Sequence, residues 1–138
     1  MTDRPNGVQW SDSLLVGHAD IDEEHKGIFA FAAELREIDA ATAPPSLASE
    51  TIYKLLEYAS THLGREEELM RRYHYPYMNG HAIEHGKFLS HLTTIIYDYE
   101  RGRDNVLQNC SDFVTRWLET HILVNDVELA NFLRHRGL

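Results

Sequence analysis

The side chains best suited to chemistry in this sequence are histidines and carboxylates at helical spacing. Nine histidines occur among 138 residues. His62 and Glu66 lie four positions apart, as do His81 and His85, so each pair projects from one face of a helix. Imidazole and carboxylate groups in such pairs are common metal ligands, although neither pair alone defines a site. The spacing therefore indicates metal binding as the first chemistry to consider.

These polar residues occupy positions where a helical bundle needs apolar side chains. Four segments carry stripes of residues at steps of three and four, as amphipathic helices do. Burial of an imidazole or a carboxylate without a partner costs several kcal/mol. One such residue fits a hydrogen-bonded core histidine, whereas six of them in four segments predict a shared ligand. The six are His25, His62, Glu66, His81, His85 and His121.

The six side chains are expected to meet in one layer of the bundle. Three lie near the starts of the first and third segments, and three lie near the ends of the second and fourth. In an up-down bundle these starts and ends share one end of the molecule. A zinc site is closed by three or four ligands, so seven candidates, with Asp126 included, are too many for one ion and suit two.

Asp126 fits this pattern less directly than the other six. It follows His121 by five residues, which is about 140° around a regular helix. Both side chains reach one site only if the helix loosens or ends between them, and Asn125, a poor helix former, lies there. The alternative role for Asp126 is an N-cap of a last helix, and spacing alone does not separate the two.

The elements that must position these residues are helices joined by short loops. Helices are expected at about 20–40, 46–73, 79–102 and 104–121, with a short one at about 126–134. The expected N-caps are Asp20 with Glu23, Ser46 and Asp104, and Gly102 is an expected helix-ending glycine. We predict one domain over residues 1–138. It is all-α: an up-down-up-down antiparallel four-helix bundle (20–135) with an N-terminal arm (1–19) and a short C-terminal helix.

Composition limits the classes of partner and the compartment. The formal net charge of −9 argues against nucleic acid and against anionic membrane surfaces. No apolar run approaches the roughly 20 residues that span a bilayer, and residues 1–10 show no signal-peptide pattern. Cys110 is the single cysteine, which gives no disulfide framework and fits a reducing compartment. We therefore expect a soluble cytoplasmic protein.

Four ordered motifs resemble those of the hemerythrin family, and within it the single-domain bacteriohemerythrins. They extend from Trp10 to about Leu133, nearly the whole chain. The motifs are Trp10 with Val16-Gly17-His18, Ile21-Asp22 and His25; His62-Leu63-Gly64-Arg65-Glu66-Glu67 with Met70; His81-Ala82-Ile83-Glu84-His85; and Trp117-Leu118 with His121-Ile122 and Asp126. The sequence departs from the family at Leu63, where Phe is commoner, and at Glu24, where Gln is commoner. Neither is a ligand position.

The resemblance implies a non-haem di-iron centre. Its cofactors would be two iron ions, Fe2+ or Fe3+, with a bridging oxo or hydroxo group. The implied ligands are His81, His85 and His121 on one iron, His25 and His62 on the other, and Glu66 and Asp126 as bridges. The remaining histidines (His18, His74, His91 and His135) are expected in surface or cap roles, and Cys110 is expected in the core.

The activity that the resemblance implies is reversible O2 binding, for carriage, storage or sensing, and not catalysis. O2 would be the ligand, and an oxygen-accepting protein that the sequence does not identify would be a partner. The alternatives are a di-iron redox enzyme acting on peroxide or nitric oxide, or an iron store. Two carboxylates, against four in ferritin-like di-iron enzymes, should stabilise Fe(III) less and so favour O2 binding. The expected apolar lining is Ile28, Phe29, Ile83, Leu118 and Ile122.

Overall fold

The computed structural model describes residues 9–39 and 41–138. Within this part of the chain there are five α-helices and no strand. The helices are α1 (Ala19–Glu37), α2 (Pro45–Arg72), α3 (Met78–Glu100), α4 (Val106–His121) and α5 (Val127–His135). A 3-10 turn at Asp12–Leu14 precedes α1, and a π-helical segment at Ile122–Asp126 joins α4 to α5. No described helix is long and apolar enough to cross a membrane.

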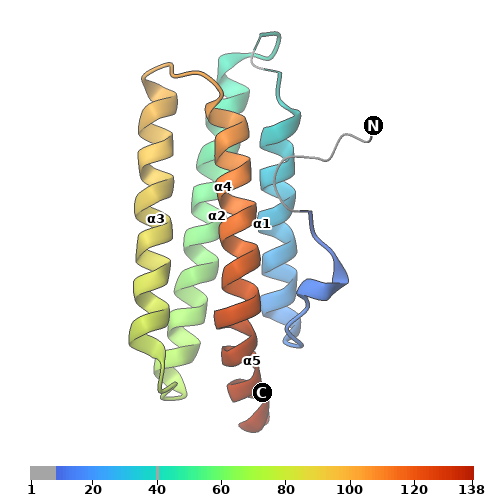
Figure 1. The fold of residues 1–138 in the computed structure, drawn as a ribbon, viewed down its shortest axis with the longest axis vertical. Helices are drawn as coiled ribbons and strands as arrows, with labels where there is room; N and C mark the ends of the chain where they lie inside the picture. The colour runs from blue at the N-terminus through green and yellow to red at the C-terminus, as the bar shows by residue number, and fades with distance from the viewer. Residues whose placement is uncertain (1–8, 40) are drawn as a thin grey trace.

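The four long helices run alternately up and down (Figure 1). Helix α1 packs against α2 and α4, and α3 packs against the same two helices, which closes the bundle. The predicted all-α, up-down-up-down architecture is therefore confirmed. The starts of α1 and α3 and the ends of α2 and α4 therefore meet at one end of the bundle. This is the lower end in Figure 1, and α5 continues beyond it.

The apolar stripes of the helices form two groups of buried side chains, one toward each end of the bundle. Leu35, Ile52, Leu92 and Val114 come from the four long helices, lie toward the upper end and are fully buried. A second apolar group closes the lower end and contains Met70, Leu129 and Leu133, also fully buried. Each such side chain contributes about 1.5–3 kcal/mol by leaving water. The layer between these two groups is occupied by polar residues.

The start of α1 differs from the prediction. The N-cap is His18, whose Nδ1 accepts the backbone N–H of Ile21 at 3.4 Å, so Asp20 with Glu23 does not form the cap. The carboxylate of Asp22 accepts hydrogen bonds from the backbone N–H groups of Val16 at 2.8 Å and Gly17 at 3.2 Å. These bonds attach the N-terminal arm to the first turn of α1.

Two other predicted caps are also wrong. Helix α2 begins at Pro45, whose fixed φ suits the first helical position, so Ser46 lies inside the first turn and not at the cap. Helix α4 has Asn105 as its N-cap in a left-handed conformation, and not Asp104. The predicted glycine end is confirmed, since Gly102 follows α3 with φ +75° and its N–H bonds to the carbonyl of Tyr99 at 3.0 Å.

Replacing either of two glycines inside helices by alanine should change stability in opposite directions. A methyl group at Gly64 would meet nothing within 4 Å, whereas one at Gly27 would overlap the Tyr58 ring. We expect Gly64→Ala to raise the free energy of unfolding by about 1 kcal/mol through helix propensity. Gly27→Ala should lower it by about 1–3 kcal/mol through overpacking. Urea unfolding followed by circular dichroism measures both, and equal effects of the two changes would contradict this packing.

Candidate metal centre

Seven side chains from the four long helices and the π segment meet in the polar layer of the bundle. All seven are buried, with at most 3% of the residue exposed. They are the seven predicted site residues: His25, His62, Glu66, His81, His85, His121 and Asp126. Their nitrogen and oxygen atoms form two groups, within each of which the atoms lie within 4.8 Å of one another. One group has three histidines, the other has two, and both carboxylates belong to each.

This division is the one that the resemblance implied. The three-histidine group contains His81, His85 and His121, and the two-histidine group contains His25 and His62. The sequence therefore predicted which side chains come together. That these atoms ligate metal ions stays a prediction.

The π segment explains how Asp126 reaches the site. A π turn pairs residues five positions apart, which places His121 and Asp126 on the same face of the helix. Asp126 Oδ1 lies 3.2 Å from His121 Nε2. The side chain makes no capping bond to α5 and is fully buried. The Asp126 side chain therefore does not act as an N-cap of α5.

The carboxylate of Glu66 lies between the two histidine groups. Its Oε2 is 2.9 Å from His62 Nε2 and 3.6 Å from His25 Nε2. Its Oε1 faces the other way, 3.3 Å from His81 Nε2 and 3.2 Å from His85 Nε2. One oxygen is therefore turned toward each group, as a bridging ligand requires.

Asp126 has the same arrangement. Its Oδ2 is 2.9 Å from His25 Nε2, and its Oδ1 is 3.0 Å from His81 Nε2. Two carboxylates that each face both histidine groups leave space for two cations side by side, which is the arrangement of two-metal centres.

The spacing of the three histidines indicates the coordination geometry. His121 Nε2 lies 3.0 Å from His81 Nε2 and 3.1 Å from His85 Nε2. If these nitrogens are at right angles around an ion, the metal–nitrogen distance is about 2.1–2.2 Å, which is ordinary for imidazole. Tetrahedral angles would shorten it to about 1.9 Å, below the usual zinc–imidazole distance. The nitrogens therefore fit one face of an octahedron.

Unsatisfied polar atoms identify what the cluster lacks. Among the described residues, the buried side-chain atoms without a hydrogen-bond partner all belong to it: both ring nitrogens of His25, Nε2 of His62, and both oxygens of Glu66 and of Asp126. Some of these atoms approach one another within 3 Å as ion pairs between imidazole and carboxylate groups. Buried polar atoms in proteins are normally paired. Cations would accept lone pairs from these atoms, so the residues present fit a pair of metal ions.

The electrostatics lead to the same conclusion. Burial raises the pKa of Glu66, but the neighbouring His62, His25 and His81 outweigh it and hold that pKa well below its usual value. Burial lowers the pKa of His62, yet Glu66 and Glu24 raise it to about 10. The pKa of His81 likewise rises to about 9 beside Asp126 and Glu66, against its burial. Without cations, the buried carboxylates thus keep protons on the imidazoles.

Two carboxylates outside the cluster fix the orientation of two histidines. Glu24 Oε1 accepts from His62 Nδ1 at 2.7 Å, and Glu67 Oε2 accepts from His85 Nδ1 at 2.9 Å. A proton held on Nδ1 leaves the Nε2 lone pair directed into the site. Glu67, next to the proposed ligand Glu66, therefore also faces the cluster. Glu67 was missed because its partner comes from another helix, and one sequence carries no signal of that contact.

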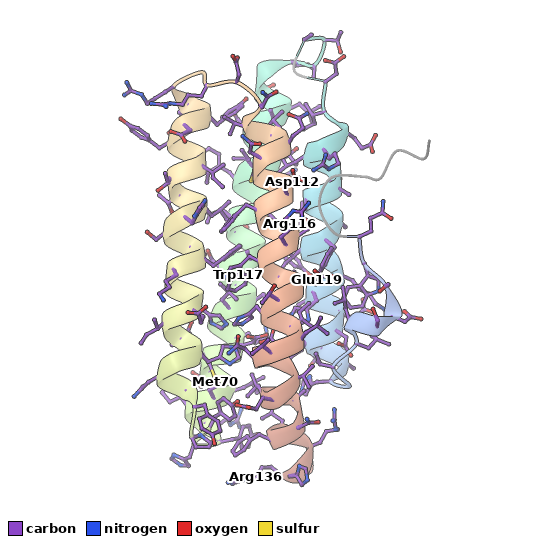
Figure 2. The ribbon with its side chains drawn as sticks, viewed as in Figure 1. Met70, Asp112, Arg116, Trp117, Glu119 and Arg136 are labelled. Carbon is purple, nitrogen blue, oxygen red and sulfur yellow. The ribbon has the colours of Figure 1, made fainter. Side chains whose placement is uncertain are left out.

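Aromatic rings support the third histidine of the larger group. Trp117 lies on the side of α4 that faces α3 (Figure 2). Its ring stacks on His121 at 4.4 Å between centroids and on Phe88 of α3 at 4.3 Å. Because a stacked ring cannot rotate freely, these contacts hold the His121 imidazole in place.

Of the five residues predicted to line the centre, four are buried and one is not. Ile28, Phe29, Leu118 and Ile122 are buried, whereas Ile83 is 59% exposed. Ile83 lies between His81 and His85, and both of these face the site, so the residue midway between them must face outward.

The residues set aside lie outside both ligand groups. His18 caps α1, His74 is exposed, His91 stacks on Phe113, and His135 contacts the carbonyl of Asn131. Cys110 is fully buried, and burial raises the pKa of its thiol to about 12, so it stays protonated as a core residue.

Comparison with known proteins gives one family. The family model described as "Hemerythrin HHE cation binding domain" matches residues 16–133. A bacteriohemerythrin from Clostridium acetobutylicum is 29% identical over 123 residues, covering 86% of this chain and 95% of that protein. A myohemerythrin from Theromyzon tessulatum is 28% identical, with 88% and 90% covered. A crystal structure of wild-type hemerythrin superposes with a TM-score of 0.80 at 26% identity, with 90% and 95% covered. The chain therefore belongs to the hemerythrin family, whose domain binds cations.

Proposed function

We propose that this protein binds O2 reversibly at a centre of two iron ions. The observation that carries the proposal is the pair of buried carboxylates, each with one oxygen toward the three-histidine group and one toward the two-histidine group. The proposed ligands are His81, His85 and His121 for one ion, His25 and His62 for the other, and Glu66 and Asp126 for both, with an oxo or hydroxo bridge from solvent. Named relatives are a bacteriohemerythrin and a myohemerythrin, which supports the same function here.

The donor set favours iron over zinc. The three-histidine group offers five donor residues, which exceeds the three or four protein ligands that a zinc site uses. A centre with five imidazoles and two carboxylates also carries less negative charge than the carboxylate-rich ferritin-like centres. Two irons held by these residues would supply reversible electron transfer to O2.

The residues of this chain define where a small ligand fits and what surrounds it. His25 and His62 form a group with one imidazole fewer than the other, so that side has room for a ligand from outside the protein. Glu24 and Glu67 keep the Nε2 lone pairs of His62 and His85 turned inward. Buried apolar residues such as Leu118 and Ile122 exclude water, which would slow irreversible oxidation of bound iron by O2.

The proposal describes a binding protein for O2 carriage, storage or sensing, and not an enzyme. It places the protein in the cytoplasm, where a single buried cysteine would stay reduced. An oxygen-accepting protein would be its partner. We further propose that the bundle of residues 20–135 forms one folding unit, because its apolar groups enclose the centre on both sides.

Repeated exposure to air and argon tests the function. In protein loaded anaerobically with Fe2+, a visible absorption band should appear with about one O2 per two irons and vanish under argon over several cycles. Its loss on every cycle shows release. A band that does not reverse, together with steady consumption of peroxide and a reducing substrate, would contradict O2 binding and assign a redox enzyme.

Single substitutions test the ligand assignment. We expect His81→Ala and His85→Ala to bind fewer than two irons per chain, because each removes a donor from the three-histidine group. His91→Ala is the matched control, since His91 is an exposed histidine of the same helix. Iron analysis after gel filtration gives the count. Two irons per chain in both site variants would remove these histidines from the assignment.

Proton release on metal binding follows from the raised imidazole pKa values. His62, at about 10, and His81, at about 9, hold protons at pH 7 that a cation must displace. We expect release of about two protons per chain at pH 7 and an affinity for divalent cations that rises with pH up to about 10. Calorimetry with Co2+ in buffers of different ionisation enthalpy measures the release. A heat independent of buffer would contradict the raised values.

A further inference from the structure

A pocket of about 190 Å3 opens beside the metal centre, between the start of α1 and the end of α2. Its lining includes Asp20, Ile21, Glu24, Arg65, Glu66 and Leu69. Glu66 is the only one of these residues that belongs to the proposed ligands, so the pocket reaches the edge of the centre at that residue.

The inner end of the pocket is formed by a buried acidic residue. Glu66 is 1% exposed, and neither of its oxygens has a hydrogen-bond partner. A buried carboxylate at the end of a pocket attracts a cation more strongly than it would in water.

An ion pair stands between Glu66 and solvent. Arg65 Nη1 lies 2.9 Å from Glu24 Oε2, and the other oxygen of Glu24 is bonded to His62 Nδ1. The Arg65 side chain is 57% exposed and that of Glu24 is 16% exposed, so the guanidinium is on the solvent side. Because Arg65 is exposed and long, it can leave Glu24 at little energetic cost.

The charges of the lining favour a cation over an uncharged molecule. Three carboxylates, those of Asp20, Glu24 and Glu66, face one guanidinium, that of Arg65. Asp20 is exposed at the first turn of α1 and forms no ion pair with any other described residue. Negative charges in a cleft raise the local concentration of cations and speed their association. They have no such effect on O2.

We propose that this pocket is the route by which divalent cations reach the metal centre. Asp20 attracts the hydrated cation, Glu24 and Glu66 receive it in turn, and Arg65 is the cover that must move aside. Glu66 then becomes a permanent ligand. The inference rests on the proposed function only in requiring that the centre bind cations, and it adds a role for three residues outside the ligand set.

Metal-uptake kinetics test this route without any O2 chemistry. Metal-free protein is mixed anaerobically with Co2+, and the visible absorption of the ligated ion gives the rate of uptake and the final stoichiometry. We expect Asp20→Asn to slow uptake roughly threefold to tenfold at low salt, and the difference to vanish near 1 M salt. Arg65→Gln should speed uptake at least threefold, because the cover and its positive charge are both lost.

Matched controls remove the same charges elsewhere on the same helices. Glu34→Gln removes an exposed carboxylate about 21 Å along α1 from Asp20, and Lys54→Gln removes an exposed cation about 16 Å along α2 from Arg65. Both controls should take up Co2+ at the rate of the unaltered protein. Circular dichroism shows whether each variant is folded.

Three other outcomes would overturn the proposed route, and they separate its failure from failure of the di-iron centre. If Asp20→Asn matches Glu34→Gln and Arg65→Gln matches Lys54→Gln, with two ions bound in all, the route is wrong and the di-iron proposal stands. If Arg65→Gln changes O2 association in the iron protein and leaves Co2+ uptake unchanged, the pocket admits O2 instead. If the unaltered protein binds fewer than two ions, both proposals fail.

Discussion

Two carboxylates buried among five imidazoles form the interaction on which the rest of this structure depends. Glu66 and Asp126 are almost fully buried, and their oxygens have no hydrogen-bond partners. An uncompensated charge in a protein interior is far more costly than any single apolar contact is stabilising. Protons on the imidazoles compensate part of it, and two cations would compensate it fully. The bundle therefore encloses a layer whose donor atoms fit two cations.

Regular antiparallel helices bring most of this layer together, and one π-helical segment completes it. Alternating helix directions place the starts of α1 and α3 beside the ends of α2 and α4, so donors near four helix ends converge. The π segment turns Asp126 onto the face of His121. Outside the layer, Glu24, Glu67 and Trp117 hold three of the imidazoles in fixed orientations.

The sequence predicted what depends on periodicity and missed what depends on contacts between helices. The stripes were enough for the four helices, their order and the convergence of His25, His62, His81, His85 and His121. Spacing alone left Asp126 undecided, and family resemblance was needed to favour it. The caps at Ser46 and Asp104 were wrong because a proline and a left-handed residue set those two helix starts, and the cap at Asp20 was wrong because the His18 side chain takes that role. Glu67 was missed because only the fold brings it to His85.

The central claim is that this layer holds two irons between the two histidine groups. Anomalous diffraction from crystals of anaerobically iron-loaded protein, recorded on both sides of the iron absorption edge, tests it most directly. We predict two iron peaks, each in contact with both Glu66 and Asp126, one near His81, His85 and His121 and the other near His25 and His62. A single peak, or peaks away from either carboxylate, would contradict the account.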